Sequence, residues 1–555
     1  MSDRALIIAA MTWLRPIFAS LGVIAMLGVC AKDGSAGPNE DILYWGSASE
    51  LETVTHYYDF RPEVEAISRL VWDRLFYREP NSPTYRPNLA RKLVWRGITT
   101  VEIDLRTDIV FHNGDRFTAD DIVETVRRLK DPDLGFPKHR GIEWIGVVEK
   151  VSRFKVRIDL KRPMPHLLEI LSGPFVVIPR AAWQSAPLEA SGRVDYSRMP
   201  PIGSGPYRVT RIEPGVQIEL ERFRSYHQSP KGKPRINRIV FSTVTDAAER
   251  RQHLMDGRLD FLSGLSKPAV DRMEREGAPV RVQRAPSMRI AFLAMDRAGR
   301  SSERTPLRKL MVRRAIAHAV NREELARLAF GPVSQVQHAL CHPAQFGCTK
   351  DVIKYPYDPK KAVELLRAAS IGPASNVRIV DQLNTFGELL PGSPPDLKAK
   401  PLRTINLDIV SYRNHPVSEA IARYLRAVGI DARVEAYSRF GTAISRLESG
   451  RLELAHMTWA SHGAMDIAET LNRLFRNGAL DYCRDAEVNR WLDVAANTND
   501  RKVRLLGYSN ALKRLQELAC ILPLYNYTSF YAHSKRLDFK PSLDDVLRFY
   551  LARWK

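Results

Sequence analysis

The hydrophobic and polar positions of residues 41–160 form short apolar runs separated by turns, with helical patterns between them. The runs DILYWGS, TTVEIDLR, DIVFHNGDRF and FKVRIDLKRP are rich in the β-branched and aromatic residues typical of strands. Residues 63–76 and 119–129 instead repeat their apolar positions with helical spacing. We therefore predict mixed α and β structure here.

The stretch IVFHNGDRFTADDIVETVRRL, residues 109–129, contains the most detailed local signal. Asn113 and Gly114 accept the positive φ angles that a tight hairpin turn needs. Thr118 and, three residues later, Asp121 have the spacing of a capping box at a helix N-terminus. The stretch predicts a hairpin followed by a capped helix.

The later part of the chain alternates strand and helix patterns. DAAERRQHLMDG predicts a helix that stops at Gly257, and YDPKKAVELLRAA predicts one capped by Asp358 with Pro359 at its first position. TINLDIVSYRNHPVSEAIARYLRAVGIDARVEAY and GTAISRLESGRLELAHMTW fit right-handed βαβ crossovers on a mostly parallel sheet. Residues 371–400 are irregular and predict a surface insertion.

The composition is that of a large folded protein with an excess of positive charge. The chain has 555 residues, enough for two to four domains, and 84 Lys and Arg against 63 Asp and Glu give a net charge of +21. Such a charge suits nucleic acid, an anionic surface or acidic solutes. The basic residues are scattered and do not form runs of five or six, so we expect no nucleic-acid partner.

The first 37 residues are typical of an export signal and linker. Within residues 11–30, one Arg precedes the apolar residues 16–29, which are too few to span a bilayer permanently. Cys30 follows them, where bacterial lipoprotein signals place the acylated cysteine, although such signals usually have a small residue at the position of Val29. We expect an exported, periplasmic protein, with lipid anchoring through Cys30 as an open alternative.

The other four cysteines form an even set suited to an oxidising compartment. Cys341 and Cys348, in CHPAQFGC, are close enough in sequence to close one loop with a disulfide. Cys483 and Cys520 remain as the second pair, and two separate buried thiols are the alternative.

We find no motif for catalysis, for a metal or for a cofactor. Cys341, His342 and Cys348 lack the second pair of close ligands that a zinc site needs, and the sequence contains no HExxH. GSGPY is not a nucleophile elbow, because it lacks the GxSxG pattern with serine at the third position. A secreted hydrolase whose catalytic groups are assembled by folding stays open as an alternative.

Seven segments, in order, resemble one protein family. They are DIVFHNGDRFTADDIVETVRRLKDP, GSGPYRV, RRAIAHAVNREEL, YDPKKAVELLRAA, LRAVGIDARVEAYS, LESGRLELAHMTW and ACILPLYNYTSFYAHSKRLDFKPS. From about residue 41 to its end, the chain resembles the family 5 extracytoplasmic solute-binding proteins of bacterial ABC importers, the oligopeptide, dipeptide and nickel type.

The resemblance implies an α/β fold of the type II periplasmic-binding-protein class, with two lobes, a hinge and an extra α+β domain. It places lobe I at 38–62, 175–270 and 505–555, the extra domain at 63–174, and lobe II at 271–504. Two chain segments would cross between the lobes, and their closure would bury a solute without altering it.

The resemblance also implies a solute-binding segment in lobe II. Peptide-binding relatives have GWxxDY here, which supplies an aromatic wall and a carboxylate for the α-ammonium of the peptide. This chain has Trp459, Ala460, Ser461 and His462, and the next acid is Asp466. Either Asp466 takes the carboxylate role through a shifted loop, or the solute has no free N-terminus. Trp459 also fits simple core packing.

In lobe I the resemblance implies a contribution from the loop after the first strand. Ser47 and Ser49 could bond a solute, although serines in loops more often cap turns. Arg413, Asn414 and Arg439 lie at predicted strand ends, where solvated surface is the simpler interpretation.

We therefore expect a monomeric, non-enzymatic receptor that captures peptides or peptide-like solutes and delivers them to ABC permease subunits in the inner membrane. A nickel chelate, an opine, an oligosaccharide or an antimicrobial peptide is the alternative ligand within the family. A transcription regulator with this domain would need a helix-turn-helix module, but only a signal-like segment precedes residue 41.

Overall fold

The computed structural model describes residues 40–55, 57–59, 61–131, 142–188, 195–369, 404–409, 415–437, 440–460 and 463–555. The following predicted features lie outside the described residues: the export segment 1–37 with Cys30, the insertion 371–400, Arg413, Asn414, Arg439, Ser461 and His462.

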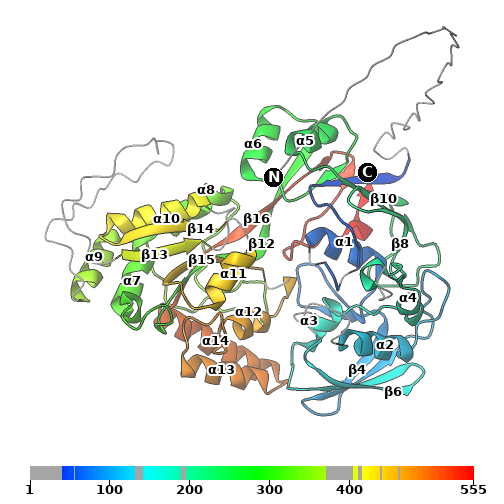
Figure 1. Cartoon of the computed structure of the whole chain (residues 1–555), viewed down its shortest axis with the longest axis horizontal. Coiled ribbons are helices and arrows are strands. Elements are labelled where there is room, and N and C mark those ends of the chain that lie inside the picture. Colours follow the sequence, from blue (N-terminus) through cyan, green and yellow to red (C-terminus); the bar gives the residue numbers. More distant parts are fainter. Residues whose placement is uncertain are drawn as a thin grey trace, which may run out of the picture. The chain divides into compact units, whose positions relative to one another are not determined.

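A four-stranded antiparallel sheet forms the extra α+β domain (Figure 1). Its order is β4 (Ala90–Trp95), β5 (Thr100–Leu105), β7 (Lys155–Leu160) and β6 (Ile145–Ser152). Helices α2 (Ala119–Leu129) and α3 (Leu167–Ser172) add apolar side chains to the same core. A separate pair, β2 (Phe76–Arg78) and β3 (Tyr85–Pro87), leads into this domain.

The turn and the helix start predicted at residues 109–129 are present, with one difference. The Thr118 backbone N–H donates to the Asp121 carboxylate over 2.8 Å, which confirms the reciprocal bond predicted at the helix start. Only Gly114 has a positive φ, 89°, because the Asn113 side chain instead accepts a hydrogen bond from the Asp115 N–H. The hairpin contains a single antiparallel bridge, between Val110 and Arg116.

A ten-stranded mixed sheet runs through the rest of the described chain in the order β14-β13-β15-β12-β16-β11-β1-β10-β9-β8. Its bounds are β14 (Asp431–Ala436), β13 (Thr404–Ile409), β15 (Leu454–Trp459), β12 (Val280–Met295), β16 (Ile521–Ser534), β11 (Phe261–Leu262), β1 (Ile42–Ser47), β10 (Arg238–Thr243), β9 (Gln217–Arg222) and β8 (Tyr207–Glu213). Strands β13, β14 and β15 are mutually parallel, as the two late βαβ patterns predicted. The prediction of a mostly parallel sheet is wrong for the sheet as a whole, because the pairings β15–β12, β12–β16, β16–β11, β10–β9 and β9–β8 are antiparallel.

Helices cover the half of the sheet that contains β12 to β15, and Figure 1 shows α8 and α10 beside β13 and β14. The helices of this half are α7 (Leu310–Ala319), α8 (Arg322–Phe330), α9 (Pro359–Ala368), α10 (His415–Ala427), α11 (Phe440–Glu448), α12 (Ala468–Leu474), α13 (Ala486–Ala496) and α14 (Arg501–Glu517). The Asp358 carboxylate accepts the Lys361 N–H over 2.9 Å, so its predicted cap is confirmed.

The other half of the sheet, with β1 and β8 to β11, has its own core around Trp45, Phe241 and Phe549. Its elements are α1 (Pro62–Val71), α4 (Arg180–Gln184), α5 (Ala247–Met255), α6 (Lys267–Arg275), β17 (Leu537–Asp538) and β18 (Arg553–Trp554). Helix α5 ends just before Gly257, whose φ is +73°, as predicted.

Two long strands, β12 and β16, join the two halves. They pair with each other from Val280 and Ser534 at one end to Ala294 and Ile521 at the other. The register shifts between Pro286 and Ile290, in the middle of this ladder. The implied pair of crossing segments is therefore built as two paired strands with an irregular middle.

Three of the implied domain limits cut through elements that fold as units. The buried side chains of α1 pack in the core around Trp45, and the core of the four-stranded sheet includes side chains from Leu75 to Val177. The limit at 270 falls inside α6, and the limit at 505 falls inside α14. The buried face of α14, including Tyr508 and Leu512, packs in the same core as Trp459.

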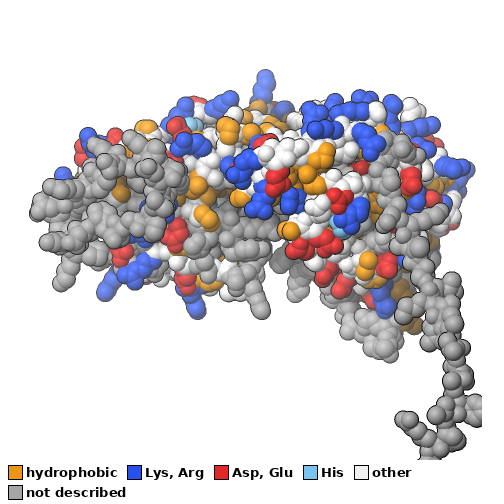
Figure 2. All heavy atoms as spheres, turned by 90° about the horizontal axis from the view of Figure 1, so that it is seen from above, with side chains coloured by type: hydrophobic (Ala, Val, Ile, Leu, Met, Phe, Trp, Pro, Cys, Tyr) orange, Lys and Arg blue, Asp and Glu red, His pale blue; other side chains and the backbone are white. Residues whose placement is uncertain are grey.

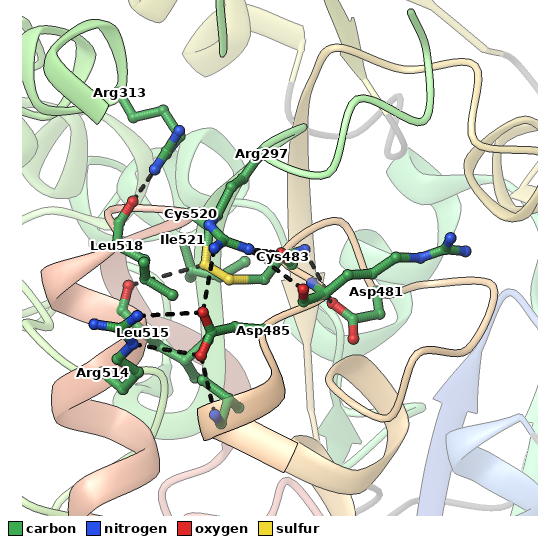
Figure 3. The surroundings of a disulfide bond; sticks show 12 residues. Arg297, Arg313, Asp481, Cys483, Asp485, Arg514, Leu515, Leu518, Cys520 and Ile521 are labelled. Carbon is green, nitrogen blue, oxygen red and sulfur yellow. Dashed lines mark hydrogen bonds and ion pairs between the residues drawn. A yellow bond between two sulfur atoms is a disulfide. The ribbon is translucent and has the colours of Figure 1, made fainter. Parts of the chain in front are cut away.

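Both predicted disulfides are present. Cys341 is bonded to Cys348, which excludes these two thiols as zinc ligands, and Cys483 is bonded to Cys520. The second bond joins the loop before α13 to the residue before β16 (Figure 3). Beside it, Asp485 forms ion pairs with Arg297 over 3.2 Å and with Arg514 over 3.3 Å.

Candidate functional site

The carboxyl ends of β1 and β15 point toward each other across the paired crossing strands. Trp45 of β1 pairs through Phe261 with His533 of β16, and Trp459 of β15 pairs through Ile290 with Asn526. The two rows are seven residues apart along β16, about 24 Å at 3.4 Å per residue. Strand β1 runs antiparallel to β16, whereas β15 runs parallel to β16. The carboxyl ends of β1 and β15 therefore point toward the irregular middle from opposite sides.

The register thus directs the two groups of predicted residues toward the same middle part of the sheet, but they stay apart and are not paired. Ser47 ends β1, and Trp459 ends β15, with three strands between them in the sheet order. Ligand sites in α/β folds lie outside the carboxyl ends of strands. Trp459 and Ala460 are half-buried there, and Trp459 packs against the lobe II core.

Ser47 and Ser49 form a turn that is braced by Glu63. The Ser47 hydroxyl donates to Glu63 Oε1 over 2.7 Å and accepts the Ser49 N–H over 3.2 Å. The Ser49 carbonyl accepts a bond from the Thr243 hydroxyl over 3.2 Å. Ser47 is buried, and its hydroxyl supports the loop. Ser49 is only half-buried.

Asp466 is a buried partner of Arg504. The carboxylate forms an ion pair with the Arg504 guanidinium through Oδ2 and accepts the Ala468 N–H through Oδ1 over 2.9 Å. Only 7% of the Asp466 side chain is exposed. Burial works against the charge of Arg504, but the attraction of Asp466 outweighs it and raises the pKa of Arg504. A solute ammonium would have to displace this guanidinium to use Asp466.

The loop closed by Cys341 and Cys348 holds the chain that follows Trp459. Phe346 forms a parallel bridge with Asp466, since its N–H donates to the Met465 carbonyl over 2.6 Å. The Gln345 amide donates to the Ala464 carbonyl over 2.8 Å. Arg504 also lies over the Phe346 ring, 4.6 Å from its centroid. The first disulfide therefore braces the segment that the resemblance assigns to solute binding.

Sequence patterns missed a set of polar and aromatic groups at the middle of the crossing strands. Arg289 lies over the ring of Tyr527, with 5.7 Å between its guanidinium and the centroid. Asp545, with a positive φ of 60°, accepts hydrogen bonds from Ser287 and Ser529. The buried Thr528 hydroxyl has no hydrogen-bond partner among the described residues. No local signal marks these groups, because the register of β12 with β16 and the later segment that contains Asp545 bring them together.

The charge, the metal ligands and the helices of the described residues add three observations. Figure 2 shows Lys and Arg side chains spread over the face drawn, with Asp and Glu side chains between them. Within the described ranges, no group of three or more His, Cys, Asp or Glu side chains could hold a metal ion. Over the same ranges, no helix is both long and apolar enough to cross a membrane.

Residues 84–482 match the model of the bacterial extracellular solute-binding proteins, family 5. The chain belongs to this family. Among curated family members, Di/tripeptide-binding protein 3 of Pseudomonas aeruginosa is 24% identical over 516 residues, which cover 87% of this chain and 89% of that protein. The Dipeptide-binding protein of Escherichia coli is 24% identical over 496 residues, or 84% of this chain and 85% of that protein.

Solved structures of family 5 proteins have the same fold. NikA from Brucella suis in complex with Fe(III)-EDTA has a TM-score of 0.76 at 21% identity, over 93% of this chain and 100% of that one. DppA from Helicobacter pylori in complex with the peptide STSA has a TM-score of 0.72 at 19% identity, over 92% and 98%. These structures and the family match confirm the implied type II periplasmic-binding-protein fold and the solute-binding class.

Proposed function

We propose that this family 5 protein captures peptides or peptide-like solutes outside the cytoplasm and delivers them to the permease subunits of an ABC importer. The observation that carries the proposal is that the carboxyl ends of β1 and β15 point toward the irregular middle of the crossing strands from opposite sides. A hinge in this middle, near Pro286, lets the two halves close on a solute held between the strand ends. The names of the curated relatives support a peptide as the solute.

Within this proposal, Trp459 and Ala460 contact the solute, together with the segment that continues to Ser461 and His462. The end of a strand offers backbone hydrogen bonds to an extended peptide, and the indole adds apolar contact area. Ser49 contacts the solute from the opposite end of the site. Asp466 supports this segment through Arg504 and is not free to pair with an ammonium.

Titration calorimetry with a panel of dipeptides and tripeptides tests the proposal, and Trp491 supplies a matched control. Trp459 and Trp491 are both half-buried and pack against the same core, so replacing either by Ala removes similar packing. We expect Trp459→Ala to weaken peptide binding at least about tenfold, the loss for one aromatic contact of 1.4 kcal/mol, while Trp491→Ala leaves affinity unchanged. Equal affinities in the two variants, or no binding by the unmodified protein to any peptide, would reject it.

A further inference from the structure

Residues 463–465 follow directly on the segment that we assign to solute binding, and two distant parts of the chain hold them. The Arg78 guanidinium, at the end of β2, donates through Nη2 to the Gly463 carbonyl over 2.8 Å. The Met465 N–H donates to Glu169 Oε1 over 2.9 Å. Arg78 and Glu169 both belong to the part of the chain that leads into and forms the extra domain, whereas 463–465 continue from β15 of lobe II.

The groups that make these contacts are buried and fixed by further partners. The same Arg78 Nη2 donates to Asp544 Oδ2 over 2.6 Å, and Asp544 is also paired with Arg548. Burial favours the neutral form of Asp544, but the Arg548 guanidinium outweighs it and lowers the pKa of this carboxyl. Glu169 also accepts the Tyr85 hydroxyl and lies 3.6 Å from Arg78 Nε. Buried charges held in this way keep one geometry, because separating them leaves an unpaired buried charge.

The close approach of these segments requires glycine at position 463. Its φ is +76°, which side chains rarely adopt, and a Cβ placed on it would lie 3.1 Å from Cβ of Asp544. The next residues are held from the lobe II side, where Gln345 and Phe346 bind Ala464 and Met465. The peptide groups of 463–465 are therefore clamped between lobe II and the extra domain.

We propose that Arg78 and Glu169 are positioning residues for solute binding. They fix the backbone of 463–465 and thereby set the orientation of Trp459 and Ala460 toward the solute, and they tie the extra domain to lobe II when the protein is closed. This inference rests on the proposed function and extends it, since it assigns the extra domain a role in capture. No contact between these two side chains and the solute itself is required.

Amide hydrogen exchange tests the clamp directly and needs no solute. Glu169→Met removes the acceptor of the Met465 N–H, so we expect exchange at Met465 to become at least tenfold faster. The Ile467 N–H is the internal control, because it donates to the Phe346 carbonyl within lobe II over 3.1 Å and should keep its protection. Glu169→Gln retains the amide oxygen as an acceptor and should restore slow exchange at Met465. Unchanged exchange in Glu169→Met would overturn the clamp.

Peptide affinity then tests the positioning role, with a pair of glycine variants that leave the buried charges intact. Gly463→Ala meets Asp544, whereas Gly478→Ala enters open space at a position without a positive φ. We expect Gly463→Ala and Glu169→Met to weaken affinity about tenfold, as for one lost hydrogen bond to a charged group, with Glu169→Gln and Gly478→Ala close to the unmodified protein. Faster exchange at Met465 with unchanged affinity would reject the positioning role. Failure of the unmodified protein to bind peptides would reject the proposed function, while exchange still decides the clamp.

Discussion

The ion pair between Asp466 and Arg504 gives a prediction that separates two roles for Asp466. If the Asp466 carboxylate stabilises the fold, removing the Arg504 guanidinium leaves an unpaired charge on a side chain that is only 7% exposed. We predict that Arg504→Met lowers the free energy of unfolding by about 3–5 kcal/mol, the usual cost of breaking a buried pair. The remaining bond from the Ala468 N–H cannot replace the guanidinium, because it satisfies only Oδ1.

The double variant Arg504→Met with Asp466→Asn sharpens the argument. It removes both charges and keeps an acceptor for the Ala468 N–H, so we expect it to be more stable than Arg504→Met alone. The assay is urea unfolding of the unmodified protein, both single variants and the double variant, with peptide titration on the same samples. If Asp466 instead anchors a solute ammonium, Asp466→Asn abolishes binding while Arg504→Met leaves stability unchanged. That pattern would refute the structural role.

Two further predictions concern stability. Loop-closure entropy predicts that the free energy of unfolding falls by about 4 kcal/mol in Cys483→Ala with Cys520→Ala and by about 2.5 kcal/mol in Cys341→Ala with Cys348→Ala, because the sequence separations are 37 and 7. Urea unfolding of the two double variants checks this order. A larger loss of stability for the short loop would contradict the prediction. Burial raises the pKa of Asp260 to about 7, so its contribution to stability is complete below about pH 4 and is lost as the pH rises to about 7. Asp260→Asn should therefore gain stability relative to the unmodified protein as the pH rises over this range. A difference in urea midpoint between the two proteins that stays the same from pH 4 to pH 8 would contradict this reasoning.

The sequence was enough to predict those parts of the fold in which residues close in sequence contact each other. The Thr118 and Asp121 pair lies within one helical turn, and Asp358 caps the helix that starts beside it, so spacing predicts both. The 341–348 disulfide closes a short loop and is predictable for the same reason. The predicted positive φ at Asn113 was wrong, because the Asn113 side chain instead accepts a hydrogen bond from the Asp115 N–H in an Asx turn.

Long-range packing decided what the sequence alone could not predict. The implied limit at 505 falls within α14, and the core in which this helix packs is visible only in the three-dimensional contacts. Asp466 and Arg504 are 38 residues apart, and Glu169 is 296 residues from Met465. Such pairs leave no spacing pattern, so the sequence indicated Asp466 as an acid near the site but not its partner.

Native mass spectrometry of the purified protein tests the central claim most directly. We predict that the protein, as purified or after incubation with a mixture of dipeptides and tripeptides, carries one noncovalent adduct of peptide mass, and that mild unfolding releases the same peptide intact. A protein that never acquires such an adduct, or that returns its peptides cleaved, would contradict capture without chemistry.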